Sequence, residues 1–359
     1  MAIYKNFNIE DAASLESSDV VTNVKDIISS GMWENGSGTL TAFYTSSTQS
    51  SSNHQYYLDV YGTNPQSDST AKPQFSIAYG HLNGSGSAGA VGIDGNRASA
   101  TVYRQLVNTL LGPNEEQFTF AGSGDHTKPA FVYAISVSRG QLREKMDPGN
   151  WELHLSGSVG ITVGNQLSHT GSFMKLIDDS GATTNPTVNA GGRVFNVVSG
   201  SIATGTAVTK TAAASNPGGG LGLFYPDLGI VVLNADTVSV SGSITLGSGS
   251  GVDGNNAGGL YNAIKRGEYF VSRREEQLNT THYFARATNQ KFNFSNNPTF
   301  FTASDGALTN ASFKNDPKSY ITTVGLYNDT NELLAVAKLS KPILKSFSRE
   351  AIIKVKLDY

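Results

Sequence analysis

Residues that could take part in chemistry are spread thinly along this chain. Asp125 and His126 form the adjacent acid–histidine pair, in the sequence GSGDHTKP, and we favour an exposed loop pair over a general base. The chain has no cysteine, which excludes disulfides and thiolate catalysis. The six histidines lack the close spacing of a preformed metal-binding face and stand at positions 54, 81, 126, 154, 169 and 282.

Two short motifs match known site sequences without the surroundings that such sites need. GSGSAG, residues 84–89, has the glycine spacing of a dinucleotide-binding turn, but AVGIDGN follows it before a helix can begin. DDSG, residues 178–181, matches an aspartic-protease turn, but ASDGA around Asp305 lacks the Ser or Thr that a second lobe would supply. We interpret DDSG as a turn whose Asp side chain bonds the following backbone. We therefore expect no catalytic, cofactor-binding or metal-binding residues, and a protein that is not an enzyme.

Composition limits the partners of this chain. Of its 359 residues only 15% are charged, and 26 Lys and Arg against 29 Asp and Glu give a net charge of -3. Such a balance provides no field that would gather a polyanion, so we expect no nucleic-acid partner. No run approaches the roughly 18 apolar residues that cross a bilayer, so we expect no direct membrane insertion. The N-terminal MAIYKNFNIEDAASLESS has no apolar segment of a secretory signal, which favours synthesis in a cytoplasm.

Periodicity predicts two early helices and many strands. Apolar residues at helical spacing predict helices over Ser17–Ser30, which Gly31 ends, and over about Arg97–Leu111. Alternating sequences rich in β-branched and aromatic residues predict strands in HQYYLDVYG, PQFSIAYG, AFVYAISVS and NWELHLSG. We interpret RGQLREKMDPGN, between the last two, as a solvated connection with a turn at Pro148 and Gly149.

Changes in composition predict three parts of the chain. These are an N-terminal α/β body over 1–177, an inserted β-region rich in Gly, Ser, Ala and Thr over 178–260, and a C-terminal β-rich part over 261–359. We expect the last part to return and complete the first core, and TVSVSGSITL of the inserted region to have strand character. The fold class that follows is mainly β, with antiparallel sheets, a small inserted β-region and a few peripheral α-helices.

The C-terminal part contains the most apolar sequence. The hairpin-like ITTVGLYNDTNELLAVAKL is apolar on both faces, so it should lie centrally in a domain or against another chain. AIIKVKLDY alternates and predicts a final strand. The aromatic KFNFSNNPTFF fits either internal packing or an anchoring arm. The candidate interface residues are Phe292, Phe294, Phe300, Phe301 and Tyr359.

Several stretches resemble structural proteins of contractile-tailed bacteriophages, in particular virion and baseplate proteins of marine cyanophage-type myoviruses. They are IYKNFNIED, QFSIAYGHLNGSGS, DPGNWELHL, GLFYPDLGIVVLN, FNFSNNPTFF, YITTVGLYNDTNELLAVAKLSKPI and IKVKLDY, in order along most of the chain apart from about 181–220. The resemblance implies a non-enzymatic virion component, made in the host cytoplasm and present in several symmetric copies in the tail or its baseplate wedge. Its partners would be other virion and tail proteins.

Two further functions stay open from the sequence. A receptor- or glycan-binding tail-fibre or decoration protein would stack exposed aromatic side chains against sugar, and SSSNHQYYLDVYG and MWENGSG supply such residues. A polysaccharide-degrading enzyme would need two carboxylates facing each other across a cleft. We expect the structural baseplate role.

Overall fold

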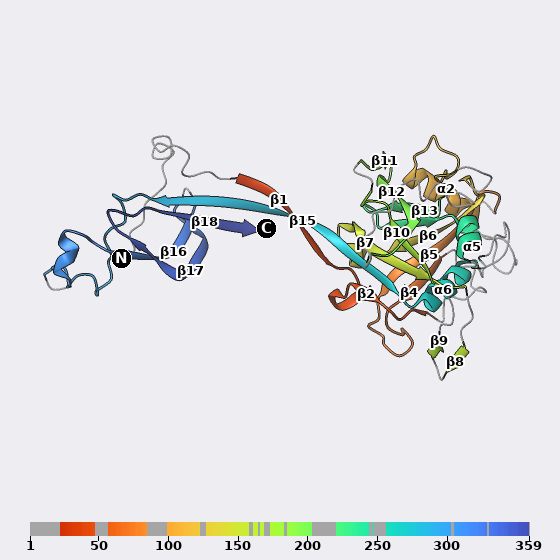
Figure 1. Ribbon diagram of the computed structural model, residues 1–359, viewed down its shortest axis with the longest axis horizontal. Coiled ribbons are helices and arrows are strands. Elements are labelled where there is room, and N and C mark those ends of the chain that lie inside the picture. Colours follow the sequence, from red (N-terminus) through yellow and green to blue (C-terminus); the bar gives the residue numbers. More distant parts are fainter. Residues whose placement is uncertain are drawn as a thin grey trace. The chain divides into compact units, whose positions relative to one another are not determined.

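The structure is a computed structural model of a mainly β protein with antiparallel sheets, which confirms the expected fold class (Figure 1). It describes residues 22–46, 57–84, 99–122, 127–157, 161–163, 166–168, 173–182, 185–202, 220–242, 244, 246, 256–302, 305–328 and 330–358.

The chain forms two compact units, unit 1 (Met1–Ile27 with Gln277–Tyr359) and unit 2 (Ile28–Glu276). The boundaries expected at 177 and 260 are not boundaries between these units. The described strands of 178–260 belong to unit 2 and pair within its sheet, because their sequences GLFY and IVVL are apolar enough to be buried on both faces. The described strands of the expected inserted region therefore lie in the same compact unit as β4, β5, β6 and β7.

One large sheet organises the described strands. Its order is β1 (Thr22–Gly31), β15 (Phe270–Ala287), β7 (Lys145–Leu155), β10 (Met174–Asp178), β12 (Gly192–Ser199), β13 (Gly222–Tyr225), β14 (Ile230–Leu233), β6 (Phe131–Val137), β5 (Pro73–His81), β4 (Tyr57–Tyr61) and β3 (Tyr44–Thr45). Additional pairings join β2 (Thr39–Leu40) and β18 (Ala351–Asp358) to β15, and β11 (Thr187–Asn189) to β12. Separate two-stranded sheets are formed by β8 (Ile161–Val163) with β9 (Gln166–Ser168) and by β16 (Ser319–Tyr327) with β17 (Leu333–Lys345).

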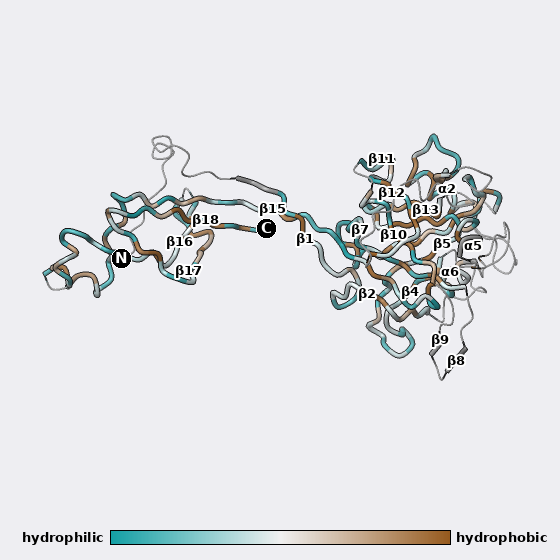
Figure 2. The backbone as a smooth tube through the Cα atoms, viewed as in Figure 1, coloured by the Kyte–Doolittle hydropathy of each residue, from teal (hydrophilic) through white to brown (hydrophobic). Residues whose placement is uncertain are grey.

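Both faces of the sheet in unit 2 are buried. Along β14, Val231 and Leu233 join one hydrophobic cluster and Val232 joins the other, as the alternation of a strand requires. The first cluster includes side chains of α5 (Ala235–Gly242) and α6 (Asn256–Gly267). The second includes side chains of α2 (Ser99–Leu110). The helices thus cover opposite faces of one sheet, and its strands appear as the brown stretches of the body in Figure 2.

The predicted elements are confirmed where one periodicity dominates. The helix expected over Arg97–Leu111 is α2, and the four predicted strands are β4, β5, β6 and β7. The expected connection RGQLREKMDPGN is wrong in part, because it contains α3 (Arg139–Leu142) and the first residues of β7. Short 3-10 helices lie at η1 (Glu34–Gly36) and η5 (Ala311–Lys314).

Two assignments are wrong because tertiary contacts override local pattern. The helix predicted over Ser17–Ser30 is replaced, in its described part, by strand β1, which neighbours β15 in the sheet. TVSVSGSITL begins inside α5, whose Ala235 and Val238 are fully buried. The side-chain oxygen of Asn234 accepts the Thr237 backbone N–H, as an N-cap does.

Unit 1 contains the C-terminal half of β15, which pairs with β18 over Thr280–Ala287. The alternation predicted for AIIKVKLDY is confirmed, since Ile353 and Val355 are buried and the lysines between and after them are exposed. The hairpin of β16 and β17 does not lie centrally in a domain. Most of its large apolar side chains are exposed or only partly buried, so the alternative of a contact with another chain stays a prediction.

A close approach within unit 2 can be tested at Gly267, the last residue of α6. A β-carbon at this position would overlap the backbone oxygen of His154 on β7, so helix and strand would have to separate. We expect Gly267→Ala to lower the free energy of unfolding by about 1–3 kcal/mol. Trp33 and Trp151, the two tryptophans of the chain, are both buried in unit 2, so fluorescence during urea unfolding reports this unit.

Gly258 in the same helix is the matched control. Open space surrounds its missing β-carbon, so Gly258→Ala should raise stability by about 0.5–1 kcal/mol through helix propensity. Equal effects of the two substitutions would contradict the close packing of α6 on β7.

Candidate functional site

Exposed apolar side chains gather in unit 1. Among the described residues, nine of the fourteen exposed large hydrophobic side chains belong to unit 1, although unit 2 is the larger unit. The nine are Ile27, Phe294, Tyr320, Tyr327, Leu333, Leu334, Val336, Phe347 and Ile352. The clusters of buried hydrophobic side chains, within the part of the chain that the structure describes, all lie in unit 2. Unit 1 therefore exposes the kind of residue that elsewhere in this chain forms a core.

Five of these side chains define what we call the apolar hairpin surface: Tyr320, Tyr327, Leu333, Leu334 and Val336. Their exposed fractions run from 40% at Tyr327 to 68% at Leu334. Because β16 and β17 form a sheet of only two strands, each also has one edge without a strand partner among the described residues. The surface thus combines exposed apolar side chains with unpaired backbone edges. A two-stranded hairpin alone is only marginally stable in water, so a further strand partner would stabilise it.

The backbone of this hairpin is regular over a short stretch. Thr323–Leu326 pairs with Ala335–Lys338 residue by residue, and the register shifts on either side, between Ile321 and Thr323 and between Leu326 and Tyr327. Pro342 lies in β17 beyond Lys338 and has no N–H to donate. The free edge of β17 is therefore apolar from Leu333 to Ala337, with an irregularity at Leu334 and regular pairing from Ala335 to Lys338.

The candidate interface phenylalanines partly pack on one another. Phe300 is buried and contacts Phe294 edge to face at 5.2 Å and Phe313 at 5.2 Å, and Phe294 stacks on Phe301 at 5.6 Å. Internal packing accounts for Phe300, whereas Phe294 remains 48% exposed. Phe292 makes a different contact, because its carbonyl accepts the Ser319 hydroxyl at 2.6 Å. Tyr359 lies outside the described residues.

A buried lysine anchors the base of the hairpin. Lys345, the last residue of β17, is fully buried, and its Nζ donates to the carbonyls of Asn289 and Ser346 and to Oδ1 of Asn293 at 3.0–3.1 Å. Burial lowers the pKa of the Lys345 ammonium, and the charge of Glu350 acts in the opposite direction. All three ammonium protons have neutral acceptors, so Lys345 ties the 289–293 segment to the hairpin.

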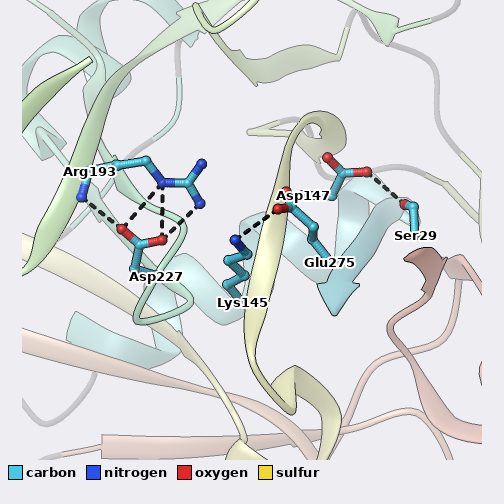
Figure 3. A network of polar contacts seen from close by, with 6 residues as sticks. All are labelled: Ser29, Lys145, Asp147, Arg193, Asp227 and Glu275. Carbon is cyan, nitrogen blue, oxygen red and sulfur yellow. Dashed lines mark hydrogen bonds and ion pairs between the residues drawn. The ribbon is translucent and has the colours of Figure 1, made fainter. Parts of the chain in front are cut away.

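Charged side chains of unit 2 form ion pairs and hydrogen bonds with other residues of the same unit (Figure 3). Arg193 donates from its backbone N, Nε and Nη2 to the Asp227 carboxylate at 2.8–3.1 Å, and Lys145 pairs with Glu275 at 2.8 Å. Burial raises the pKa of Asp227, but the hydrogen bonds from Arg193 outweigh it and the pKa is lowered. Ser29 donates to Asp147 at 2.6 Å. Arg193 and Lys145 each have a carboxylate partner, and Asp147 accepts from the neutral Ser29, so this network connects segments of unit 2 that are distant in sequence.

Ion pairs also fasten the end of unit 2 on β15. The Glu276 carboxylate receives Nη1 of Arg143 at 3.0 Å and Nε of Arg274 at 2.9 Å. Arg274 also donates to the Ser30 hydroxyl at 2.8 Å. Strand β15 is therefore held to β1 and to the segment after α3 at the residues where it leaves this unit.

Glu152 and His154 form an acid–histidine pair that the sequence analysis missed. Both lie on one face of β7, with the Glu152 carboxylate 2.6 Å from Nε2 of His154. The second carboxylate oxygen accepts the Ser201 hydroxyl at 2.9 Å and the Ile202 backbone N–H at 2.8 Å. Alternation along a strand was the available signal, since residues two apart share a face.

This cluster does not have the order of a nucleophilic triad. There, the histidine lies between the serine and the carboxylate and takes the serine proton. Here the carboxylate of Glu152 lies in the middle, and Ser201 donates to Glu152. Burial alone would raise the pKa of Glu152. The hydrogen bonds from His154, Ile202 and Ser201 have the larger, opposite effect, so the pKa lies below its ordinary 4.5. The arrangement binds a carboxylate and holds the segment at 201–202 against β7.

The other sequence candidates are dispersed. Asp178 accepts the Ser180 backbone N–H at 2.9 Å, which confirms the turn interpretation of DDSG. Burial lowers the pKa of His81, whose ring stacks on Phe131 at 5.9 Å. The pair Asp125–His126 lies outside the described residues, as do residues 85–89 of the glycine motif.

An open depression of about 410 Å³ lies over the face covered by α2. Its lining includes Glu115, Gln117, Phe120, Asp179 and Asn196. Asp179 already accepts the backbone N–H and side-chain amide of Asn196 at 2.8 and 2.7 Å. The carboxylate is thereby satisfied within the chain.

Comparison with protein-family models, curated proteins and solved structures finds no match. Among the described residues, no group of three or more His, Asp and Glu side chains is placed to hold a metal ion. None of the helices described is both long and apolar enough to span a bilayer. The exposed apolar side chains of β16 and β17, and the strand edges left unpaired within the described ranges, make the apolar hairpin surface the candidate site.

The Glu152 cluster makes a prediction about stability and pH. Glu152→Gln should lower the free energy of unfolding at pH 7 by about 1–3 kcal/mol, because a buried charged acceptor of three hydrogen bonds is replaced. Because the pKa of Glu152 is lower in the folded state than in the unfolded state, the ionised carboxylate stabilises the fold above pH 4.5. This stabilisation is lost as the pH falls from 4.5 through the pKa of the folded state. The difference between variant and original chain should therefore shrink in urea unfolding below pH 4.5.

The exposed Glu115 is the control for this experiment. Glu115→Gln should leave the free energy of unfolding within about 0.5 kcal/mol at each pH. A Glu152→Gln difference that stays constant down to pH 3 would contradict the assigned role of the carboxylate.

Proposed function

We propose that this chain is a structural subunit of a contractile-tailed phage virion, a component of the tail baseplate wedge that joins neighbouring subunits through unit 1. The observation on which the proposal rests is the concentration of exposed apolar side chains in unit 1. The sequence resemblance described above supports the choice of particle. Other virion and tail proteins are the partners, in a finished particle assembled in the host.

The placement of exposed apolar side chains supports an assembly interface. Five of the nine exposed apolar side chains of unit 1 lie on the single hairpin of β16 and β17. Gathered apolar side chains of this kind mark interaction sites on ordinary proteins, whereas single exposed ones need no explanation. The hairpin therefore has the composition of an assembly contact.

The glycan-binding alternative has less support. Trp33 of MWENGSG is buried, and its Nε1 donates to the carbonyl of Phe270 at 2.9 Å, so it is not available to stack on sugar. Tyr44 and Tyr57 are the exposed aromatic residues near the β3 edge of the sheet. A glycan array separates the two functions, because a chain used only for assembly should bind no host surface sugar.

Incorporation into particles tests the proposal. In the phage that encodes this chain, Leu334→Ser with Val336→Ser should reduce the copies per particle at least tenfold by quantitative mass spectrometry of purified virions. The reason is that the two substitutions remove exposed apolar contacts and leave unit 2 unchanged. Val188→Ser is the matched control, since Val188 is a strand valine of unit 2 that is 72% exposed.

The proposal has two clear failures. A chain that is absent from finished particles is not a virion component. Particles that take up the Leu334 and Val336 variant at the level of the original chain would instead move the assembly contact away from the hairpin.

A further inference from the structure

We propose that β17 pairs along its free edge with β17 of a second copy of this chain, across a two-fold axis near Ala335. The inference rests on the proposed function, because it names the partner of the apolar hairpin surface. The two hairpins would form one continuous antiparallel sheet of four strands. Three or more strands with an apolar face are stable where a lone hairpin is not.

The edge of β17 suits strand addition. From Leu333 to Ala337 it has no charge and no proline, and Leu333, Leu334 and Val336 are exposed by 52–68%. Natural proteins usually place lysine or proline on an exposed apolar edge strand to prevent pairing with another chain. In β17 such residues come only after this stretch, at Lys338 and Pro342. The backbone edge from Leu333 to Ala337 is therefore available to pair with another strand.

Charge order within the strand selects a second copy, in antiparallel orientation. Glu332 precedes the apolar stretch and Lys338 ends it, and both are exposed. In antiparallel pairing centred on Ala335, with the chain extended through the irregularity at Leu334, Leu334 lies opposite Val336 of the second copy and Glu332, just before β17, lies opposite its Lys338. A two-fold axis makes this contact twice. Parallel pairing would instead place like charges together, which destabilises a cross-strand pair.

The charges are free to make these contacts. Lys338 has no ion-pair partner among the described residues, and on its own hairpin it lies opposite Thr323. The Glu332 carboxylate accepts hydrogen bonds from the neutral side chains of Asn328 and Thr330, at 2.7 and 3.2 Å, and no cation of the described part of the chain pairs with it. Glu332 precedes β17, and the strand from Leu333 to Lys338 separates it from Lys338 by well over 10 Å, roughly 3.3 Å per residue, so the two cannot pair with each other in one copy.

A charge exchange tests the register in the full chain. Glu332→Lys and Lys338→Glu, made singly, should each raise the dimer dissociation constant by roughly tenfold or more, because each places like charges at two symmetry-related contacts. The double variant should restore the original value, since it exchanges the partners. Analytical ultracentrifugation measures the constant. Lys341→Glu, on the same strand beyond the proposed pairing, is the control and should leave it unchanged.

A cross-link tests the two-fold centre independently. The chain has no cysteine, so Ala335→Cys introduces one thiol per copy. Directly opposite residues in an antiparallel pair have β-carbons about 4.5–5.5 Å apart, near the range for a disulfide. Mild oxidation of the full chain should give a covalent dimer at least tenfold faster than Thr322→Cys on the exposed side of β16.

The outcomes separate this inference from the proposed function. A chain that is monomeric at high concentration, a double variant that is not rescued, or equal cross-linking of the two cysteine variants overturns the pairing. Cross-linking of Ala335→Cys to a different protein in the particle also overturns it, and leaves the virion role intact. A dimer that forms as described by a chain absent from virions overturns the virion role alone.

Discussion

The described apolar side chains are largely buried in unit 2 and largely exposed or only partly buried in unit 1, and the rest of the structure depends on this difference. In unit 2 one sheet has apolar side chains on both faces, and α2 on one side and α5 and α6 on the other bury them. Hydrophobic burial is the main favourable contribution to folding, so this arrangement gives unit 2 its own hydrophobic core. Unit 1 has the same kind of strand sequence without comparable helices among its described elements. Its exposed surface is what remains when strands outnumber the elements that could cover them.

The polar groups of the body complement this division. The carboxylates of Glu152, Asp179 and Asp227 are satisfied by hydrogen bonds within the chain, and the ion pairs of Figure 3 join β12 to the turn before β14 and β7 to β15. A buried charge is tolerated when its partners are supplied locally. Such groups specify how the segments of unit 2 meet.

Much of the fold could be predicted where one periodicity is unambiguous. The helical spacing that includes Val107 and Leu110 belongs to α2, where both residues are buried, and the alternation of Ile353 and Val355 belongs to β18. The signal failed where small or β-branched residues suit both states. The described part of the segment predicted as helix before Gly31 became β1 because β15 offers it a partner, and the segment after Asn234 became α5 because that residue caps a helix.

Contacts between distant residues limited the prediction of the site. The apolar hairpin was visible in the sequence, but its exposure was not, since exposure depends on which elements fail to cover it. Glu152 and Ser201 meet across 49 positions, and no local pattern joins them. The candidate phenylalanines illustrate the same limit, because Phe300 packs inside its own cluster while Phe294, six positions away, stays open to water.

Strand β15 links the two units through one uninterrupted backbone of 18 residues. Its first part is laddered to β7, and Arg274, Glu275 and Glu276 clamp it where that ladder ends. A pull along this strand would load neighbouring hydrogen bonds together, in shear, and they would not open one after another. Several of these bonds would have to break at once before β15 could slide past β7, so its root in unit 2 should resist mechanical extension.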